Sequence, residues 1–315
     1  MAPRRIVVII PCFNEAAAIG GVVGGFRAAL PEAAIIVYDN NSRDDTAARA
    51  RAAGAVVRRE TRQGKGNVIR RAFADVEADV YVLVDGDGTY DPTSAPAMVQ
   101  RLVDERLDMV TATRVADAAG VWRPGHRLGN RVLTGLVQAC FGHAVTDMLS
   151  GYRVFSRRFV KSFPALAAGF ETETELTVHA LELGLPVAEL PTPYRERAAG
   201  SSSKLHTVRD GLRILRTIVV LVKDVRPLAF FSLAGAVLLA VGLGLGAGVV
   251  VTFLETGLVP RLPTAVLAMG LVLASLLAFA CGLILDSVAR GRKEAKRLAY
   301  LRIPAVEAEE AGAAP

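Results

Sequence analysis

The chain has 315 residues, enough for one sizeable domain with further elements, and it is 52% hydrophobic with a formal net charge of +6. Its three cysteines show neither a CxxC pair nor the spacing of metal ligands, which argues against a disulfide framework and a cysteine metal site. The basic excess lies beside two long uncharged segments, so it indicates a membrane surface as partner and no nucleic acid.

Strands and helices alternate in the first part of the chain. Four runs are continuous and β-branched, the pattern of strands buried on both faces of a parallel sheet. These runs cover residues 5–11, 33–39, 54–59 and 79–85, and helix-like stretches cover residues 15–30, 44–53 and 66–77. The alternation predicts an α/β domain with a mostly parallel sheet.

Polar side chains follow three of the predicted strands. Asn14 and Glu15 follow the first, residues 39–42 the second, and residues 85–87 the fourth. In open α/β sheets, ligands bind beyond the carboxyl ends of the strands. Helix capping could explain one such cluster, but three together predict a ligand site at this edge of the sheet.

Asp85 and Asp87 form a DxD pair with Gly86 between them. Two carboxylates so close repel each other, and a divalent metal with oxygen ligands would relieve that repulsion and clamp a diphosphate. A plain polar turn is the alternative for an isolated DxD. Lys65 stands between two glycines at a predicted helix start, a place suited to anions, although the P-loop pattern is absent.

Two uncharged segments follow, residues 227–254 and 262–285. Each is longer than the roughly 20 residues that a spanning helix needs, so we expect a transmembrane hairpin. A pair of buried core helices is the alternative. The flanks, residues 204–226 and 287–302, each carry six basic residues. By the positive-inside rule, both flanks and both termini are expected in the cytoplasm, in a multi-pass protein of the inner membrane.

Residues 206–226 are predicted to form an amphipathic helix that can lie in the headgroup plane, with an ordinary surface helix as the alternative. Its apolar stripe is Val208, Leu212, Leu215, Val219 and Val222, and its basic stripe is Arg209, Arg213, Arg216 and Lys223.

The first uncharged segment holds two overlapping small-residue motifs, Gly242-xxx-Gly246 and Gly244-xxx-Gly248. They could pair two copies of the chain as a homo-oligomer, or let the two spans of one hairpin approach closely. A bias toward small residues would explain them equally well.

The motifs PCFNE, YDNNSRDDT, GKG, DGDG and DP resemble, in order and spacing, the inverting family 2 nucleotide-sugar glycosyltransferases of the GT-A type. SGYRVFSRR, FETETEL and PYRERAAGSSSKL are similar to the polyprenyl-phosphate branch, which contains dolichol-phosphate mannosyltransferase. The resemblance implies a Rossmann-like GT-A catalytic domain followed by an interface helix and a two-helix hairpin. The expected boundaries are 1–205 for the catalytic domain, 206–226 for the interface helix, 227–286 for the hairpin (about 227–254 and 262–286), and 287–315 for a basic cytoplasmic segment with a disordered tail.

The resemblance also implies roles for residues at matching positions. The donor nucleotide would be bound by Pro11, Asn14, Glu15, Asp39, Lys65 and Asp85. Asp87, with Asp85, would hold Mg²⁺ or Mn²⁺ on the diphosphate. The acceptor phosphate would be received by Arg153, Arg197, Ser203 and Lys204. The sequence departs from the family at Asn40 and Asn41, where Asp-Gly is more usual, and at Thr89, where some relatives have a metal-binding amide.

An acceptor that is already ionised changes what catalysis requires. A phosphate monoester has a second pKa of about 6, so at neutral pH it needs cations to hold it more than a base to deprotonate it. Arginines suit this task. We therefore expect Asp85, Asp87, Asp147 and Arg153 in the catalytic centre. Asp147 could act as a base, orient Arg153, or be a plain helix or turn carboxylate. Glu173 and Glu175 could position acceptor-site arginines or cap a helix.

The expected function is transfer of a hexose or N-acetylhexosamine from a nucleotide-diphosphate sugar to polyprenyl phosphate, undecaprenyl or dolichyl, at the cytoplasmic face. A UDP-sugar is favoured because the motif after the second strand departs from the mannosyltransferase form. The alternatives are a GDP-mannose-dependent enzyme, transfer to a glycolipid hydroxyl, and a non-catalytic nucleotide-sugar-binding membrane scaffold.

Overall fold

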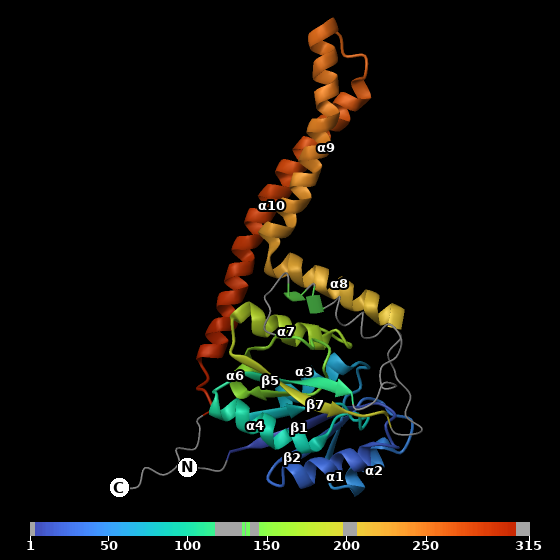
Figure 1. The fold of residues 1–315 in the computed structure, drawn as a ribbon, viewed down its shortest axis with the longest axis vertical. Coiled ribbons are helices and arrows are strands. Elements are labelled where there is room, and N and C mark those ends of the chain that lie inside the picture. Colours follow the sequence, from blue (N-terminus) through green and yellow to red (C-terminus); the bar gives the residue numbers. More distant parts are fainter. Residues whose placement is uncertain (1–3, 117–133, 136, 139–144, 198–206, 307–315) are drawn as a thin grey trace, which may run out of the picture. The chain divides into compact units, whose positions relative to one another are not determined.

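A computed structural model describes residues 4–116, 134–135, 137–138, 145–197 and 207–306 (Figure 1). Ser203 and Lys204 therefore lie outside the described residues. The chain divides into two compact units. One is Met1–Ile218 with Lys296–Pro315, and the other is Val219–Ala295.

The first unit is built on a seven-stranded sheet with the order β3-β2-β1-β4-β6-β5-β7. β6 runs antiparallel to both of its neighbours, and the other pairings are parallel. The strands are β1 (Ile6–Cys12), β2 (Ala34–Asp39), β3 (Val56–Arg59), β4 (Val80–Leu83), β5 (Met109–Ala116), β6 (Arg153–Ser156) and β7 (Val187–Tyr194). The predicted α/β fold with a mostly parallel sheet is confirmed.

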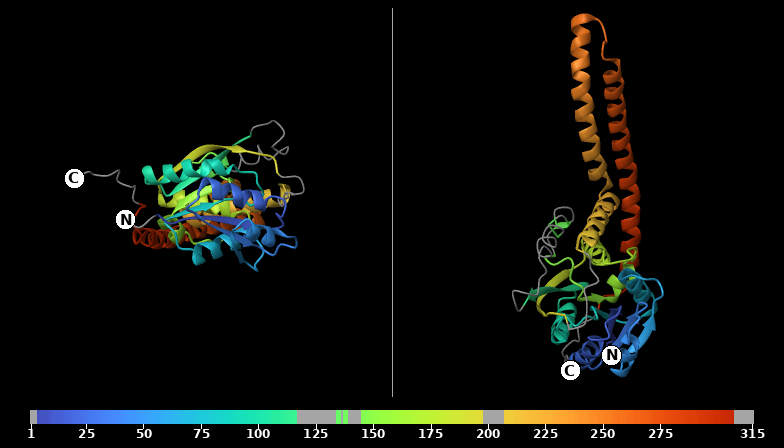
Figure 2. Two further views of the ribbon diagram at one scale, coloured as in Figure 1. Left: turned by 90° about the horizontal axis from the view of Figure 1, so that it is seen from below. Right: turned by 90° about the vertical axis from the view of Figure 1, so that its right-hand side faces the viewer.

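Helices cover both faces of this sheet (Figures 1 and 2). Val8 and Ile10 of β1 pack with α1 (Ile19–Ala29), α2 (Thr46–Ala52) and α4 (Ala95–Asp104) on one face. Val7 and Ile9 pack with α3 (Lys65–Asp75), α6 (Arg157–Ser162) and α7 (Thr172–Leu183) on the other. Alternate side chains of one strand thus enter two separate cores, which is why these strands are apolar without interruption. A short 3₁₀ turn, η1 (Pro92–Ser94), precedes α4.

A helix occupies the predicted amphipathic segment. α8 runs from Thr207 to Val225. Leu212 and Leu215 of the predicted apolar stripe are exposed, whereas Ile214 and Ile218 are buried. The apolar face predicted for the headgroup region is therefore not used for packing at these two positions.

The second unit contains two long apolar helices side by side, α9 (Pro227–Thr256) and α10 (Leu262–Leu301) (Figure 2). Both are long and apolar enough to cross a membrane. They pack through small residues. A Cβ added to Gly242 would lie 3.1 Å from Leu271, and one added to Gly235 would lie 3.1 Å from Phe279. A Cβ added to Gly244 or Gly248 would meet nothing within 4 Å among the described residues. Gly242 therefore serves close approach within the hairpin.

The last turns of α10 belong to the first unit. Lys296 Nζ lies 2.7 Å from Glu182 Oε2, and the Tyr300 hydroxyl donates to Asp108 Oδ2 at 2.9 Å. The guanidinium of Arg158 stacks over the Tyr300 ring, 4.8 Å from its centroid. Part of the basic segment predicted beside the membrane surface thus packs within the first unit.

Candidate active site

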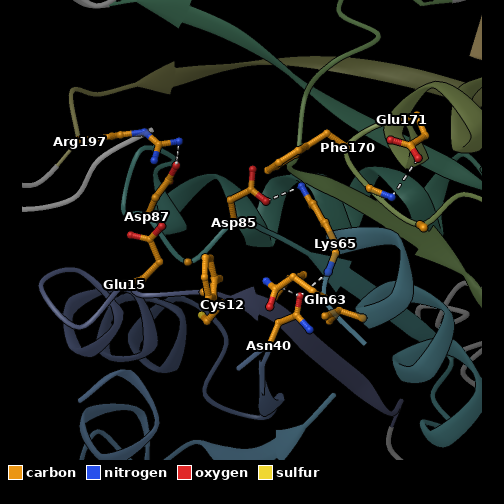
Figure 3. Close-up of a pocket in the computed structure, with 17 residues that line it drawn as sticks. Cys12, Glu15, Asn40, Gln63, Lys65, Asp85, Asp87, Phe170, Glu171 and Arg197 are labelled. Carbon is orange, nitrogen blue, oxygen red and sulfur yellow. Dashed lines mark hydrogen bonds and ion pairs between the residues drawn. The ribbon is translucent and has the colours of Figure 1, made fainter. Parts of the chain in front are cut away.

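A cavity of about 510 Å³ opens at the carboxyl ends of β1 and β4 (Figure 3). The end of β1, the loop after β2, the start of α3, the DxD turn, the loop before α7, and Arg197 all contribute to it. Its charged and polar lining side chains are Glu15, Asn40, Gln63, Lys65, Asp85, Asp87, Glu171 and Arg197. The clusters predicted to share one edge of the sheet do meet here.

Asp85 is paired with Lys65 at the floor of the cavity (Figure 3). The same ammonium lies 2.5 Å from Glu173 Oε1. Burial alone lowers the pKa of Lys65, but attraction to the two carboxylates outweighs it and raises the pKa above its usual value. Burial raises the pKa of Glu173, and Lys65 opposes that rise. Lys65 is therefore a fixed positive charge shared by two carboxylates.

Glycines leave the space that this charge cluster occupies. A Cβ on Gly151 would lie 2.2 Å from Asp85 Oδ2 and 2.9 Å from Lys65 Nζ. A Cβ on Gly64 would lie 2.2 Å from the carbonyl oxygen of Ala168, and Gly64 also has a φ of +129°. The GKG motif is thus explained by close backbone approach to the loop before α7, at a helix start that delivers Lys65.

Asp87 is paired with a different cation from the other side of the cavity. Arg197 Nη2 lies 2.6 Å from Asp87 Oδ2 (Figure 3). The other carboxylate oxygen accepts hydrogen bonds from the Thr89 hydroxyl at 2.7 Å and the Thr89 backbone N–H at 3.1 Å. Thr89, a departure from the family pattern, orients the carboxylate. The two aspartates of the DxD pair are each neutralised by a cation of the chain.

Asn40, the other notable departure, organises the loop that leads into α3. Its Nδ2 donates to the carbonyls of Glu60 at 2.9 Å and Arg62 at 2.7 Å. Its Oδ1 accepts from the Gly64 N–H at 2.7 Å and from Gln63 Nε2 at 3.3 Å. A carboxylate could not donate to the two carbonyls. An amide here is therefore a structural requirement of this loop.

The residues predicted to bind the donor separate into two groups. Pro11, Glu15, Lys65 and Asp85 line the cavity. Asn14 and Asp39 do not line it. Asn14 has a φ of +54°, and its Oδ1 accepts from the Arg43 N–H at 2.7 Å. Asp39 is buried, and its Oδ1 accepts from the Ser42 N–H at 3.2 Å. Both side chains accept hydrogen bonds from the loop after β2 that contains Asn40.

Arg153 and Asp147 lie away from the cavity lining. Arg153 is fully buried, and its guanidinium donates to the carbonyl of Ser150 at 3.1 Å and to the Thr177 hydroxyl at 2.9 Å. In this arrangement Arg153 supports the core beside β6 and cannot meet a phosphate. The carboxylate of Asp147 accepts two hydrogen bonds from the guanidinium of Arg114, at 2.8 and 2.7 Å, and one from the Arg114 backbone N–H at 3.2 Å. Asp147, for which a base, an orienting group for Arg153 and a plain helix or turn carboxylate were the alternatives, is thus held in a bidentate pair with Arg114.

The loop before α7 supplies lining residues that the sequence reading missed, Ala168, Gly169, Phe170 and Glu171. Glu171 Oε1 accepts from the Gly169 N–H at 3.1 Å. Glu175 accepts from the N–H groups of Leu166 and Ala167, each at 2.9 Å, and so holds the same loop. The FETETEL carboxylates were expected either to position acceptor-site arginines or to cap a helix. Glu173 instead forms an ion pair with Lys65.

The described residues contain no group of three or more histidine, cysteine or acidic side chains placed to hold a metal ion. The DxD turn places two carboxylates in the cavity lining, Asp85 paired with Lys65 and Asp87 paired with Arg197. This fits Mg²⁺ or Mn²⁺ of the substrate-bridged kind, since such ions are held by one or two carboxylates together with phosphate oxygens and water. It does not fit a metal enclosed by protein ligands.

Comparisons with known proteins give the chain its family. The model of glycosyl transferase family 2 matches residues 7–163. Glycosyltransferase AglJ of Haloferax volcanii is 34% identical over 249 residues, which cover 77% of this chain and 80% of that protein. Dolichyl-phosphate hexose transferase of the same organism is 28% identical over 214 residues, 68% of this chain and 92% of that protein.

A solved structure shares the fold. Glucosyl-3-phosphoglycerate synthase from Mycobacterium tuberculosis, in complex with Mn²⁺, uridine diphosphate and phosphoglyceric acid, matches with a TM-score of 0.58 at 26% identity. The match covers 70% of this chain and 78% of that chain. The GT-A fold expected from the motifs is thereby confirmed. The chain belongs to glycosyl transferase family 2 and is a glycosyltransferase.

Proposed function

We propose that this glycosyltransferase moves a hexose or N-acetylhexosamine from a nucleotide-diphosphate sugar, with UDP as the favoured nucleotide, to a polyprenyl phosphate. The observation that carries the proposal is the ion pair between Asp87 and Arg197, both of which line the cavity. A carboxylate that can hold a metal on a diphosphate thus faces a guanidinium that can hold a second phosphate. Both charges are needed where one anion leaves and another attacks.

The donor half of the proposal rests on the DxD turn. Asp87 would hold Mg²⁺ or Mn²⁺, and a metal bound there would neutralise the diphosphate as it leaves. The similar synthase was crystallised with Mn²⁺ and uridine diphosphate, which supports a divalent metal and a uridine nucleotide for this chain too. Pro11, Glu15 and Asn40 would line the nucleotide, and Asp85, fixed by Lys65, would face the ribose or the sugar.

In the transfer itself, an oxygen of the acceptor phosphate attacks the anomeric carbon from the face opposite the leaving group. The new bond joins that oxygen to the anomeric carbon. The bond between the anomeric carbon and the β-phosphate oxygen breaks, and nucleoside diphosphate leaves with the electron pair. No proton has to be removed, because the acceptor is already ionised. Asp85 and Asp87 are both paired with cations, which suits the holding of charge better than the taking of a proton.

The acceptor half rests on three further features. Arg197 lines the cavity, and the sequence predicts Ser203 and Lys204 as its partners in phosphate binding. α9 and α10 are long and apolar enough to hold the enzyme at a membrane, where a polyprenyl chain resides. A relative is named a dolichyl-phosphate hexose transferase. The basic flanks favour the cytoplasmic face of the inner membrane, with both termini in the cytoplasm.

The test uses the purified full-length chain in detergent with Mn²⁺, undecaprenyl phosphate and a panel of radiolabelled UDP- and GDP-sugars. Label is counted in the extracted lipid, with Asp87→Ala as the control. The expected result is label from one UDP-sugar that is absent in the control. Label from GDP-mannose instead would assign the mannosyltransferase alternative. Label only in a glycolipid acceptor would overturn the phosphate acceptor, and nucleotide binding without any transfer would leave a scaffold.

A further inference from the structure

Both carboxylate oxygens of Asp87 have partners within the chain. Thr89 donates twice to Oδ1, and Arg197 lies 2.6 Å from Oδ2. A metal that used Asp87 would need one of these oxygens. Thr89 lies two residues further along the same turn and moves with Asp87, whereas Arg197 comes from the segment after β7. Arg197 therefore occupies the side of Asp87 that a metal can take.

We propose that Arg197 is the counterion of Asp87 until the metal of the incoming donor complex replaces it there. Only after this exchange is the guanidinium of Arg197 available to bind the acceptor phosphate. One guanidinium would thus neutralise two anions in turn. The donor complex would bind first and the acceptor second. The inference deepens the proposed function and rests on it for the identity of the acceptor.

The two DxD cations differ in a way that makes one exchangeable and the other fixed. The side chain of Lys65 is 7% exposed and shared by Asp85 and Glu173. The side chain of Arg197 is 29% exposed. A buried charge shared by two carboxylates is costly to remove, whereas a guanidinium near solvent keeps much of its hydration when it leaves a partner. Exchange at Asp87 therefore leaves the Lys65 cluster undisturbed.

The backbone beside Arg197 is anchored, so a change of side-chain rotamer suffices for the exchange. The Arg195 N–H donates to the Thr89 carbonyl at 2.8 Å, and Tyr194 forms an antiparallel bridge with Tyr90. These contacts fix the chain two and three residues before Arg197. The guanidinium can thus leave the carboxylate of Asp87 while its backbone remains beside the cavity.

Competition between Arg197 and a metal for Asp87 predicts the direction in which loss of the guanidinium changes metal affinity. Removing the guanidinium frees Asp87 and should tighten metal binding, although the same change should weaken binding of the acceptor phosphate. The apparent affinity of a ligand is reduced by the fraction of protein that is not competent to bind it. A partly exposed ion pair then predicts that Arg197→Ala binds Mn²⁺ roughly threefold to tenfold more tightly than the wild type.

The experiment measures free Mn²⁺ by electron paramagnetic resonance during titration of the full-length protein in detergent, without nucleotide or acceptor. Arg195→Ala is the matched control, because it removes the same charge from the same segment at a side chain 58% exposed and 3.5 Å from Asp91. Tighter Mn²⁺ binding in Arg197→Ala alone supports the exchange. Equal affinities in all three proteins, or the same tightening in the control, would overturn it.

A second measurement tests the order of binding. Affinity for farnesyl phosphate, a short prenyl monophosphate, is measured with and without Mn²⁺ and uridine diphosphate. The expected result is tighter binding with the donor complex in the wild type, and no such dependence in Arg197→Ala, because coupling between sites is reciprocal. Independence in the wild type would overturn the inference. Failure of the proposed function would appear separately, as absence of labelled lipid with the Mn²⁺ competition intact.

Discussion

The ammonium of Lys65 lies 2.5 Å from Glu173 Oε1, and this contact joins the start of α3 to the start of α7 across the floor of the cavity. Asp85 shares the same ammonium. Lys65 remains protonated between these two groups, because their attraction outweighs the effect of burial on its pKa. The carboxylate repulsion expected from the DxD pattern is thus relieved by side chains of the chain as well as by any metal.

The Gly151→Ala variant tests whether this cluster matters for catalysis. The new Cβ would lie 2.2 Å from Asp85 Oδ2 and 2.9 Å from Lys65 Nζ, so the charged ends of this pair must shift. We expect turnover to fall by about 10²-fold, as misplacement of a positioning group commonly costs. Gly24→Ala in α1 is the control, since its Cβ meets nothing within 4 Å. Turnover of Gly151→Ala within twofold of wild type would remove Asp85 from the donor site.

The Asp87→Asn variant keeps the size of the side chain and an oxygen that can accept from Thr89, but loses the charge. Because metal binding at this position depends on that charge, we expect metal-dependent transfer to fall by roughly 10²- to 10³-fold, the usual cost of losing one group that stabilises the transition state. Asp104→Asn, an exposed change on α4, controls for loss of a carboxylate as such. A near-normal rate with the same Mn²⁺ dependence would show that the metal is held elsewhere.

The central strands were predictable because burial on both faces leaves a continuous apolar run, as in Ile6–Cys12. β5, β6 and β7 were not predicted. β6 begins with Arg153 and ends with Ser156, so it lacks the continuous apolar run of the central strands. β7 contains Pro191 and Pro193, which argue against a strand unless it lies at an edge. β7 is such an edge strand, since it stands last in the strand order, beside β5.

The site was predictable where its residues follow strands, and not where distant segments meet. Lys65 and Asp85 were expected in one site, but the contact of Lys65 with Glu173 joins helices far apart in sequence. Arg153 illustrates the opposite case. Its motif suggested a phosphate ligand, whereas the structure buries its guanidinium against the Ser150 carbonyl and the Thr177 hydroxyl. Burial depends on tertiary packing, which no local pattern records.

The Asn40→Asp variant tests the amide that organises the loop before α3. The carboxylate would face the carbonyls of Glu60 and Arg62 without a proton to donate. Leaving buried groups unsatisfied costs about 1–3 kcal/mol each, so we expect a clear fall in melting temperature and weaker nucleotide binding. Asn41→Asp is the matched control, because Asn41 makes exposed hydrogen bonds, to the Thr61 carbonyl and to Gln63 Oε1. Equal melting temperatures in the two variants would refute this role of Asn40.

His179 makes the stability of the catalytic unit depend on pH. Burial, aided by Lys296, lowers the pKa of His179 to about 3 from an ordinary value near 6.5. Between these two pKa values, the imidazole of His179 is therefore protonated in the unfolded chain and neutral in the folded chain. This contribution is complete above pH 6.5 and is lost as pH falls toward 3, at a cost of about 2 kcal/mol between pH 7 and pH 5.

Thermal unfolding of the wild type and His179→Gln at pH 7 and pH 5 measures this dependence. The glutamine amide can still reach Ser162, whose Oγ lies 3.1 Å from His179 Nε2, but it does not titrate. The wild type should lose more stability than the variant on acidification. Parallel losses in both proteins would mean that His179 is already protonated in the folded state or exposed to water.

The hydroxyl of Tyr300 is one of the hydrogen-bond donors to the carboxylate of Asp108, which is fully buried. Asp108 Oδ1 accepts from the Ser156 hydroxyl at 2.7 Å, and Oδ2 accepts from Arg158 at 3.1 Å and Tyr300 at 2.9 Å. Burial, aided by Asp108, raises the pKa of Tyr300 to about 12, so the hydroxyl remains a donor at neutral pH. The last turn of α10 is thereby bound to the catalytic unit through a buried charge.

Tyr300→Phe keeps the ring under Arg158 and removes only the donor. Hydrogen bonds to charged groups are worth about 1.5–3 kcal/mol, so the variant should melt at a lower temperature and digest sooner with protease near the C-terminal end of α10. Lys293→Ala, an exposed change earlier in the same helix, is the control. If Tyr300→Phe unfolds like the wild type, Asp108 is satisfied by Arg158 and Ser156 alone. The end of α10 would then be held only by Lys296 and its neighbours.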